Sequence, residues 1–188
     1  MMKNFIVKKV RCFSDIFILS VITFVSCQQL QSQTKNPSAK NAIVYVCLPC
    51  GQACDEIVSD APGVCSICHM KLVDKSTVRF KTISPAEMNA YVQQHPDVVL
   101  LDVRTKEEFE GKADPNYPTL KNAINIPVQE LEGRLASIAY LKKKKIIVYC
   151  SHAHRSAVAS YMLTQNGFND VTNMSGGVST IKPEELIK

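Results

Sequence analysis

The stretch from residue 144 to residue 156, KKIIVYCSHAHRS, decides the fold because an apolar run leads through a polar loop into a helix. Residues 146 to 149 form a continuous apolar run, as in strands that are buried on both faces. Residues 155 to 166 carry apolar side chains on one helical face, and Gly167 then supplies the helix stop. A buried strand followed by a helix in this way is typical of an α/β fold.

Strand and helix signals alternate on both sides of this stretch. Ser84, Pro85 and Glu87 provide an N-cap, a proline at the first helical position and a capping-box glutamate, so a helix is expected to begin there. Thr105 and Glu108 form a second capping box. Further strands are expected within residues 78–83, 98–101, 124–126 and 171–173, and a further helix within 131–138. The pattern predicts a parallel sheet flanked by helices.

Cys150 is expected at the carboxyl end of a central strand, where open parallel sheets bind their ligands. Unpaired N–H groups and the helix dipole favour the thiolate over the thiol there, and Arg155 adds a fixed cation. Such a site can attract an anionic sulfur donor, accept its outer sulfur and hold the resulting persulfide. The other residues of this loop are Ser151, His152, Ala153, His154 and Ser156. The two histidines can adjust the charge of the loop near neutral pH, although loop histidines are more often simply exposed.

Four segments occur in an order that resembles the rhodanese superfamily, across about 100 residues. They are Leu101-Asp102-Val103-Arg104, Ala123-Ile124-Asn125-Ile126-Pro127, the CSHAHRS loop at 150–156 and Ser175-Gly176-Gly177. The resemblance implies a rhodanese domain over residues 77–188. It also implies a transfer of sulfane sulfur, through a persulfide on Cys150, from a small anionic donor such as thiosulfate to a thiophilic acceptor. No cofactor is required for that transfer.

Two details of the loop refine what this resemblance implies. Four residues separate Cys150 from Arg155, as in sulfurtransferases, whereas related phosphatases of this fold carry one residue more. Ala153 stands where the family usually has glycine, so a positive φ there would cost roughly 1 kcal/mol or more. A non-catalytic, rhodanese-like binding domain is the alternative to catalysis.

Three charged residues near the second capping box, Asp102, Arg104 and Glu108, are candidates for acid–base chemistry. A carboxylate and a guanidinium at a strand end more often bond each other or fix adjacent loops. We therefore expect structural roles for these residues.

Residues 43–75 form a cysteine-rich module. Cys47-x-x-Cys50 and Cys65-x-x-Cys68 are separated by fourteen residues, a spacing that lets four thiolates converge on one tetrahedral ion. Zinc or another soft metal suits such a set. Tyr45-Val46-Cys47 and the segment APGVCSICHMKL at 61–72 resemble the small heavy-metal-binding domain found beside metal transporters, although Cys50 lies where that family usually has histidine.

Other chemistry remains open for these cysteines. In an exported protein they can form disulfides, and the two C-x-x-C pairs can act as redox dithiols. Cys54 and Met70 are candidate extra ligands. A segment this short needs a metal or a cross-link in any of these cases, because its core is small.

Residues 1–26 have the pattern of an export signal, with a basic start followed by an apolar stretch too short to span a bilayer. Phe24-Val25-Ser26-Cys27 resembles a bacterial lipobox, which would leave Cys27 as the lipid-bearing N-terminus. Simple secretion and an uncleaved anchor are the alternatives. Residues 27–42 are polar and are expected to form a flexible tether. The protein is therefore expected outside the cytoplasm, attached to a membrane of the bacterial cell envelope and facing the periplasm or the cell surface.

Composition sets a broad limit on function. The chain has 188 residues, is 46% hydrophobic and carries a formal charge of +5. Most of that charge lies in residues 1–26, so the remainder is nearly balanced, which by itself argues neither for nor against nucleic acid. We expect no nucleic-acid partner. Two functional hypotheses follow: an exported sulfurtransferase that carries a metal-binding module, and a metal-handling or metal-sensing lipoprotein with a non-catalytic rhodanese-like domain. A thiol–disulfide exchange protein is a third.

Overall fold

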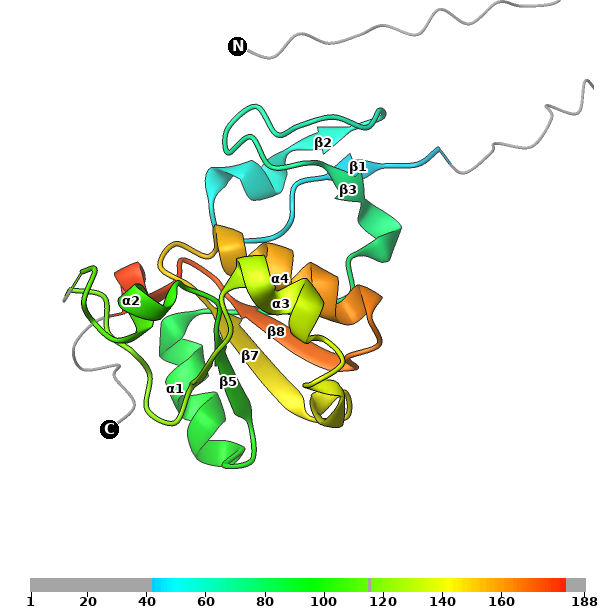
Figure 1. The fold of residues 1–188 in the computed structure, drawn as a ribbon. Helices are drawn as coiled ribbons and strands as arrows, with labels where there is room; N and C mark the ends of the chain where they lie inside the picture. Colours follow the sequence, from blue (N-terminus) through cyan, green and yellow to red (C-terminus); the bar gives the residue numbers. More distant parts are fainter. Residues whose placement is uncertain (1–41, 115, 182–188) are drawn as a thin grey trace, which may run out of the picture. The chain divides into compact units, whose positions relative to one another are not determined.

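The computed structural model describes residues 42–114 and 116–181. Within them, the main sheet has five strands in the order β4-β8-β7-β5-β6, and every pairing is parallel (Figure 1). The strands are β4 (Lys81–Ile83), β5 (Val99–Asp102), β6 (Ile124–Asn125), β7 (Lys145–Tyr149) and β8 (Asp170–Met174). The predicted α/β architecture is confirmed, and the strand that leads to Cys150 is the central one.

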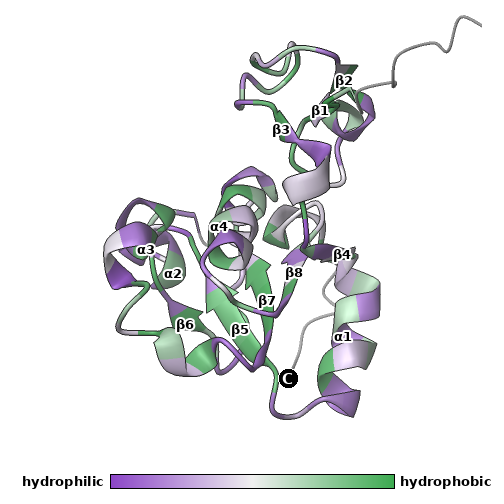
Figure 2. Cartoon of the chain, turned by 90° about the vertical axis from the view of Figure 1, so that its right-hand side faces the viewer, coloured by the Kyte–Doolittle hydropathy of each residue, from purple (hydrophilic) through white to green (hydrophobic). Residues whose placement is uncertain are grey.

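Helices cover both faces of this sheet because the side chains of β7 alternate between two hydrophobic clusters. Ile147 packs with Met88 of α1 (Pro85–Gln94) on one face. Ile146 packs on the other face, in the cluster that includes residues of α3 (Val128–Arg134) and α4 (His154–Gln165). Figure 2 shows β5 and β7 as hydrophobic strands between α1 and the other two helices. Burial on both faces explains the unbroken apolar run in the sequence.

The predicted helix starts are confirmed. Both capping boxes form, at Ser84 before α1 and at Thr105 before α2 (Lys106–Phe109). The helix expected to continue to residue 138 ends earlier, at Arg134, and turns lead from it to a 3₁₀ helix, η3 (Ala139–Leu141). Gly133 near the end of α3 lowers the helix propensity there.

The cysteine-rich module contains a small antiparallel sheet in the order β2-β1-β3. Its elements are β1 (Tyr45–Val46), η1 (Ala53–Glu56), β2 (Val58–Ser59), β3 (Val73–Asp74) and η2 (Lys75–Thr77), and η2 precedes β4. Leu48, Leu72 and four of the cysteines belong to the same hydrophobic cluster as the inner side chains of α4. The module therefore shares a core with the larger domain.

Hydrogen bonds attach the start of the module to the end of β8. The Asn173 side chain donates to the carbonyl of Pro49 over 2.9 Å, and the Gly176 N–H donates to the carbonyl of Cys50 over 3.0 Å. Gly51 has a φ of 80°, and a Cβ at that position would lie 2.6 Å from Ser175 Cβ. Only a glycine fits this close approach.

The predicted signal segment (1–26), Cys27 and all but the last residue of the tether (27–42) lie outside the described residues. Within 42–114 and 116–181, no helix is both long enough and apolar enough to cross a membrane.

Replacement of Gly51 tests the attachment between the module and the domain. Gly51→Ala combines a left-handed backbone with a steric overlap, so we expect it to lower the free energy of unfolding by about 2 kcal/mol. Gly63→Ala is the matched control because nothing lies within 4 Å of its added Cβ. Thermal and denaturant unfolding measure both variants. Equal stabilities would contradict the close approach.

Candidate active site

Cys150 lies directly after β7, and three residues separate it from the first residue of α4. We call residues 150–156 the Cys150 loop. The thiol is 1% exposed, and its Sγ donates a 3.5 Å hydrogen bond to Ser156 Oγ, which in turn donates to the Ala153 carbonyl over 3.1 Å. The first N–H groups of a helix have no partner within the helix. The predicted nucleophile therefore lies beside the positive end of α4, as expected.

Arg155 connects the Cys150 loop to α2. Its guanidinium donates two short hydrogen bonds to the Glu108 carboxylate, of 2.6 and 2.7 Å, and a third of 3.2 Å to Ser151 Oγ. Ser151 Oγ donates to Glu108 Oε1 over 2.9 Å. The Arg155 hydrogen bonds are the largest cause of a Glu108 pKa lowered to about 2. Glu108 also raises the pKa of Arg155, and Cys150 contributes in the same direction through a charge interaction and a hydrogen bond.

Asp102 and Arg104 form a second, fully buried ion pair. Arg104 Nη2 lies 2.7 Å from Asp102 Oδ2, and both side chains are fully excluded from solvent. The guanidinium also donates to the carbonyls of Tyr117 and Pro118 and to Thr119 Oγ1. This pair therefore fixes a neighbouring loop rather than exchanging protons, which agrees with the structural role expected for it.

Ala153 adopts a left-handed conformation, with φ 66° and ψ −12°, as the N-cap residue of α4. The expected strain at this position is thus present, and the backbone conformation is the one that glycine adopts at no steric cost. The buried Ala153 side chain packs in the same hydrophobic cluster as Cys150. The loop adopts this turn with alanine in place of the family's usual glycine because the surrounding residues hold the backbone in place.

The Gly176-Gly177 turn holds the start of the Cys150 loop. The Val178 N–H donates to the Cys150 carbonyl over 2.9 Å, and the Ser179 N–H donates to the Ser151 carbonyl over 3.0 Å. A Cβ on Gly177 would lie 2.6 Å from the Cys150 carbonyl oxygen. The backbones can approach this closely only with glycine.

The two histidines of the loop point to different neighbours. His152 is exposed, and its Nε2 lies 3.3 Å from Tyr117 Oη. His154 is half-buried and lies beside the thiols of Cys50 and Cys54 in the cysteine-rich module. The sequence places both histidines in the loop, but no sequence pattern indicates that His154 lies beside Cys50 and Cys54.

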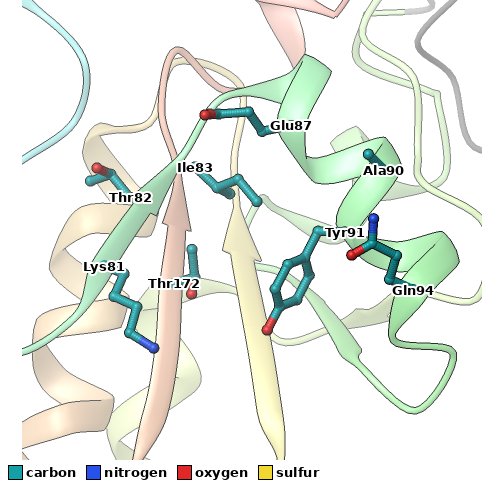
Figure 3. A pocket seen from close by; sticks show the side chains of 8 residues that line it. All are labelled: Lys81, Thr82, Ile83, Glu87, Ala90, Tyr91, Gln94 and Thr172. Carbon is teal, nitrogen blue, oxygen red and sulfur yellow. The ribbon is translucent and has the colours of Figure 1, made fainter.

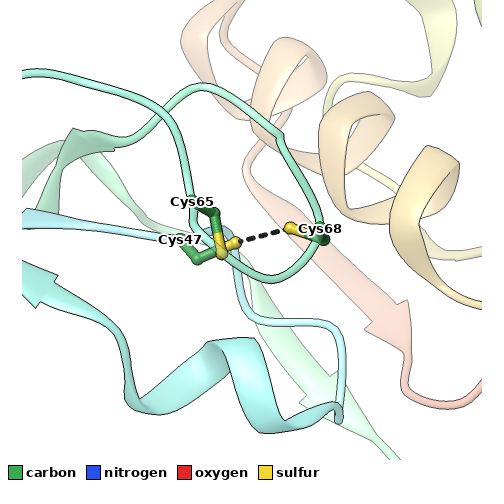
Figure 4. Close-up of side chains that lie close together, drawn as sticks. All are labelled: Cys47, Cys65 and Cys68. Atoms are coloured by element: carbon green, nitrogen blue, oxygen red, sulfur yellow. Dashed lines mark hydrogen bonds between the residues drawn. The ribbon is translucent and has the colours of Figure 1, made fainter.

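The four predicted metal-ligating cysteines divide between two groups. Cys47, Cys65 and Cys68 have ligand atoms within 4.8 Å of one another, and the sulfurs of Cys47 and Cys68 are 3.4 Å apart (Figure 4). Burial and the hydrogen bond with Cys68 raise the pKa of Cys47. The Cys68 backbone N–H is the largest cause of a Cys65 pKa lowered to about 7. These thiols can hold a soft metal ion.

Cys50 does not belong to that group, so the predicted convergence of all four thiols is not what the structure shows. The Asp55 carboxylate accepts hydrogen bonds from the N–H groups of Cys50 and Gly51, at 2.9 and 2.7 Å. This turn directs the Cys50 sulfur toward Cys54, at 3.4 Å. Met70 only packs against the edge of the core.

A surface pocket of about 390 Å³ lies away from these groups, between α1 and the strands β4 and β8 (Figure 3). Lys81, Tyr91 and Thr172 are among its lining side chains. The described residues that line it include neither cysteine nor histidine, so none of the predicted site residues lines this pocket.

Comparison with known proteins agrees with this geometry. The family description "Rhodanese-like domain" matches residues 84–184, which is more than half of the chain. The chain belongs to the rhodanese-like family. The matched segment contains four strands of the sheet, β5 to β8, and the Cys150 loop, whereas β4 and the cysteine-rich module precede it.

Curated relatives are longer than the matched segment. A tRNA uridine(34) hydroxylase of Cytophaga hutchinsonii is 31% identical over 112 residues, which cover 58% of this chain and 34% of the relative. A protein of the same name from Escherichia coli O1:K1 is 32% identical over 100 residues, or 51% of this chain and 27% of the relative. This chain spans about a third of their length, so their names do not establish its activity.

Solved structures of similar sequence also have rhodanese names. The rhodanese-like domain protein of Staphylococcus aureus is 28% identical, with a TM-score of 0.47, and the match covers 57% of this chain and 97% of that one. A rhodanese-related protein of Thermoplasma volcanium is 29% identical, with a TM-score of 0.45, over 54% of this chain and 89% of that one.

Replacement of Ala153 tests the strain in the Cys150 loop of the rhodanese-like domain. Ala153→Gly relieves the left-handed conformation, so we expect the free energy of unfolding to rise by about 0.5 to 1 kcal/mol. Ala157→Gly, inside α4, is the matched control and should lower it by about 1 kcal/mol. Denaturant unfolding compares the two variants. A loss of stability in Ala153→Gly would contradict the strain.

The lowered pKa of Glu108 predicts a dependence of stability on pH. Because the folded pKa, about 2, lies below the unfolded value, the stabilisation is complete above about pH 4.5 and is lost as pH falls toward 2. Glu108→Gln should remove about 2 kcal/mol at neutral pH and flatten that part of the profile. Glu107→Gln, which changes an exposed neighbour, should leave the profile unchanged. Parallel profiles for wild type and Glu108→Gln would show that the pair does not stabilise the fold.

Proposed function

We propose that this chain is a sulfurtransferase in which Cys150 carries sulfane sulfur as a persulfide. The observation that carries the proposal is the position of the Cys150 thiol, between the end of the central strand and the start of α4, with Arg155 in the same loop. A thiolate in this position faces unpaired N–H groups and a cation, which stabilise negative charge on sulfur. A buried structural thiol would need neither.

The proposed reaction has two steps. The Cys150 thiolate attacks the outer sulfur of an anionic donor, the sulfur–sulfur bond of the donor breaks, and the remainder leaves with the bonding electron pair. With thiosulfate the leaving group is sulfite. A thiophilic acceptor then attacks the terminal sulfur of the persulfide, and Cys150 leaves as a thiolate. No net oxidation or reduction of the enzyme occurs.

The hydrogen bonds of Arg155 limit its ability to bind a donor anion. Both guanidinium nitrogens that face Glu108 are already committed to its carboxylate. The arginine therefore cannot clamp a donor anion in a bidentate manner without losing this pair. The backbone N–H groups of the Cys150 loop and the dipole of α4 remain to stabilise the terminal sulfur of the persulfide.

We also propose that the cysteine-rich module binds a soft metal ion, zinc being the best fit, through Cys47, Cys65 and Cys68. Three sulfurs that lie this close together match the thiolate sites that zinc prefers. The same observation favours the second candidate function, a metal-handling or metal-sensing protein in which the rhodanese-like domain only binds a partner. The two candidate functions differ in whether Cys150 accepts and passes on sulfur.

Export and lipid attachment are a further part of the proposal. They rest on the basic start, the apolar stretch and the lipobox-like segment that ends at Cys27. The acceptor would then be a thiophilic molecule outside the cytoplasm, and the membrane would be the main partner of the N-terminus. Disulfides or a redox dithiol in the module remain the competing chemistry in such a compartment.

Sulfur uptake tests the proposed function. Reduced protein treated with thiosulfate or polysulfide should gain the mass of one sulfur atom on the peptide that contains Cys150, and a dithiol should remove it. Cys150→Ser should abolish the gain. Cys68→Ser, which changes a thiol of the module, is the matched control and should retain it. Uptake that is unchanged in Cys150→Ser, or absent from the reduced wild type, would contradict catalysis and favour the binding function.

A further inference from the structure

The contact between the cysteine-rich module and the Cys150 loop contains a group of ligands that neither function uses. Cys50 and Cys54 are fully buried, and their sulfurs lie 3.4 Å apart. The Asp55 carboxylate holds the backbone of Cys50 and also lies 3.4 Å from its sulfur. The two thiols are therefore positioned by a turn and are not loosely packed side chains.

His154 completes the group from a distant part of the chain. As the first residue of α4 it is half-buried, and one of its ring nitrogens lies within 4.8 Å of both sulfurs. His152 in the same loop turns instead toward Tyr117. His154 therefore offers one ring nitrogen as a ligand atom to the group.

We propose that Cys50, Cys54 and His154 form a second soft-metal site, which joins the cysteine-rich module to the Cys150 loop. Two thiolates and one imidazole are the three protein donors of some tetrahedral zinc sites, whose fourth position takes a water or a substrate atom, and they also suit other thiophilic ions. Ligand atoms around a tetrahedral zinc ion lie roughly 3.3 to 3.8 Å apart. Two sulfurs bound to one zinc ion lie roughly 3.8 Å apart, slightly farther than the 3.4 Å between Cys50 and Cys54, and the His154 ring nitrogen lies within 4.8 Å of both sulfurs.

The site is distinct from the first group of cysteines. Cys47, Cys65 and Cys68 form their own cluster within the module, whereas this one needs a residue of the rhodanese-like domain. An ion bound here would hold His154, whose neighbour Arg155 donates hydrogen bonds to Glu108 and to Ser151 of the Cys150 loop. A bound ion would therefore restrict the conformation of the Cys150 loop.

Metal stoichiometry in the full chain tests the second site. Anaerobically reduced protein is loaded with Co²⁺ or Zn²⁺, freed of excess ion and subjected to elemental analysis and to absorption spectroscopy of the cobalt form. We expect about two ions per chain, with one cobalt site that has mixed nitrogen and sulfur ligands. His154→Gln should lower the content to about one ion and remove the mixed-ligand signal. His152→Gln is the matched control and should keep the metal content and the mixed-ligand signal of the wild type.

A double variant in the other cysteine group distinguishes loss of one metal site from misfolding of the module. Cys47→Ser with Cys65→Ser should remove the other ion and retain the mixed-ligand signal. Three results would overturn the proposal: the same metal content in His154→Gln and wild type, a single ion bound by sulfur alone, or a Cys50–Cys54 disulfide that persists after reduction. Sulfur uptake at Cys150 is measured in the same samples. Its failure would contradict the proposed function without bearing on the metal content, so the two failures are distinguishable.

Discussion

The close approach of the Gly176-Gly177 turn to the Cys150 loop is the constraint on which the rest of the structure depends. A side chain on Gly177 would collide with the carbonyl groups of Cys150 and Ser151, and N–H groups just beyond the turn bind those same carbonyls. On its other side, the Gly176 N–H binds the Cys50 carbonyl. One turn after β8 thus positions both the nucleophile and the start of the cysteine-rich module.

Much of this arrangement could be predicted because its signals are local. The apolar run before Cys150 indicates a strand buried on both faces, and the two capping boxes mark the starts of α1 and α2. At Ala153 the resemblance to the rhodanese family, which usually has glycine there, indicated a left-handed residue, and the structure has one. These features depend only on neighbouring residues.

Contacts between distant residues could not be predicted in the same way. The C-x-x-C spacings suggested that four thiols share one ion, but the Asp55 carboxylate turns Cys50 toward Cys54. Nothing in the spacing indicates that His154, about a hundred residues later, lies beside that pair. The partner of Glu108 is likewise non-local: Asp102 and Arg104 bind each other at the strand end, and Arg155 binds Glu108 from the start of α4. Side-chain direction and tertiary packing determine these contacts.

In the proposed reaction the persulfide forms in a preformed loop, where backbone N–H groups stabilise the sulfur and Glu108 binds the Arg155 side chain. The most direct test is a crystal structure of the reduced protein after treatment with thiosulfate. We predict one additional sulfur atom on Cys150 Sγ, directed toward the N–H groups of residues 151–155, with the Glu108–Arg155 pair intact. An unmodified Cys150, or an added sulfur on a cysteine of the module instead, would contradict the account.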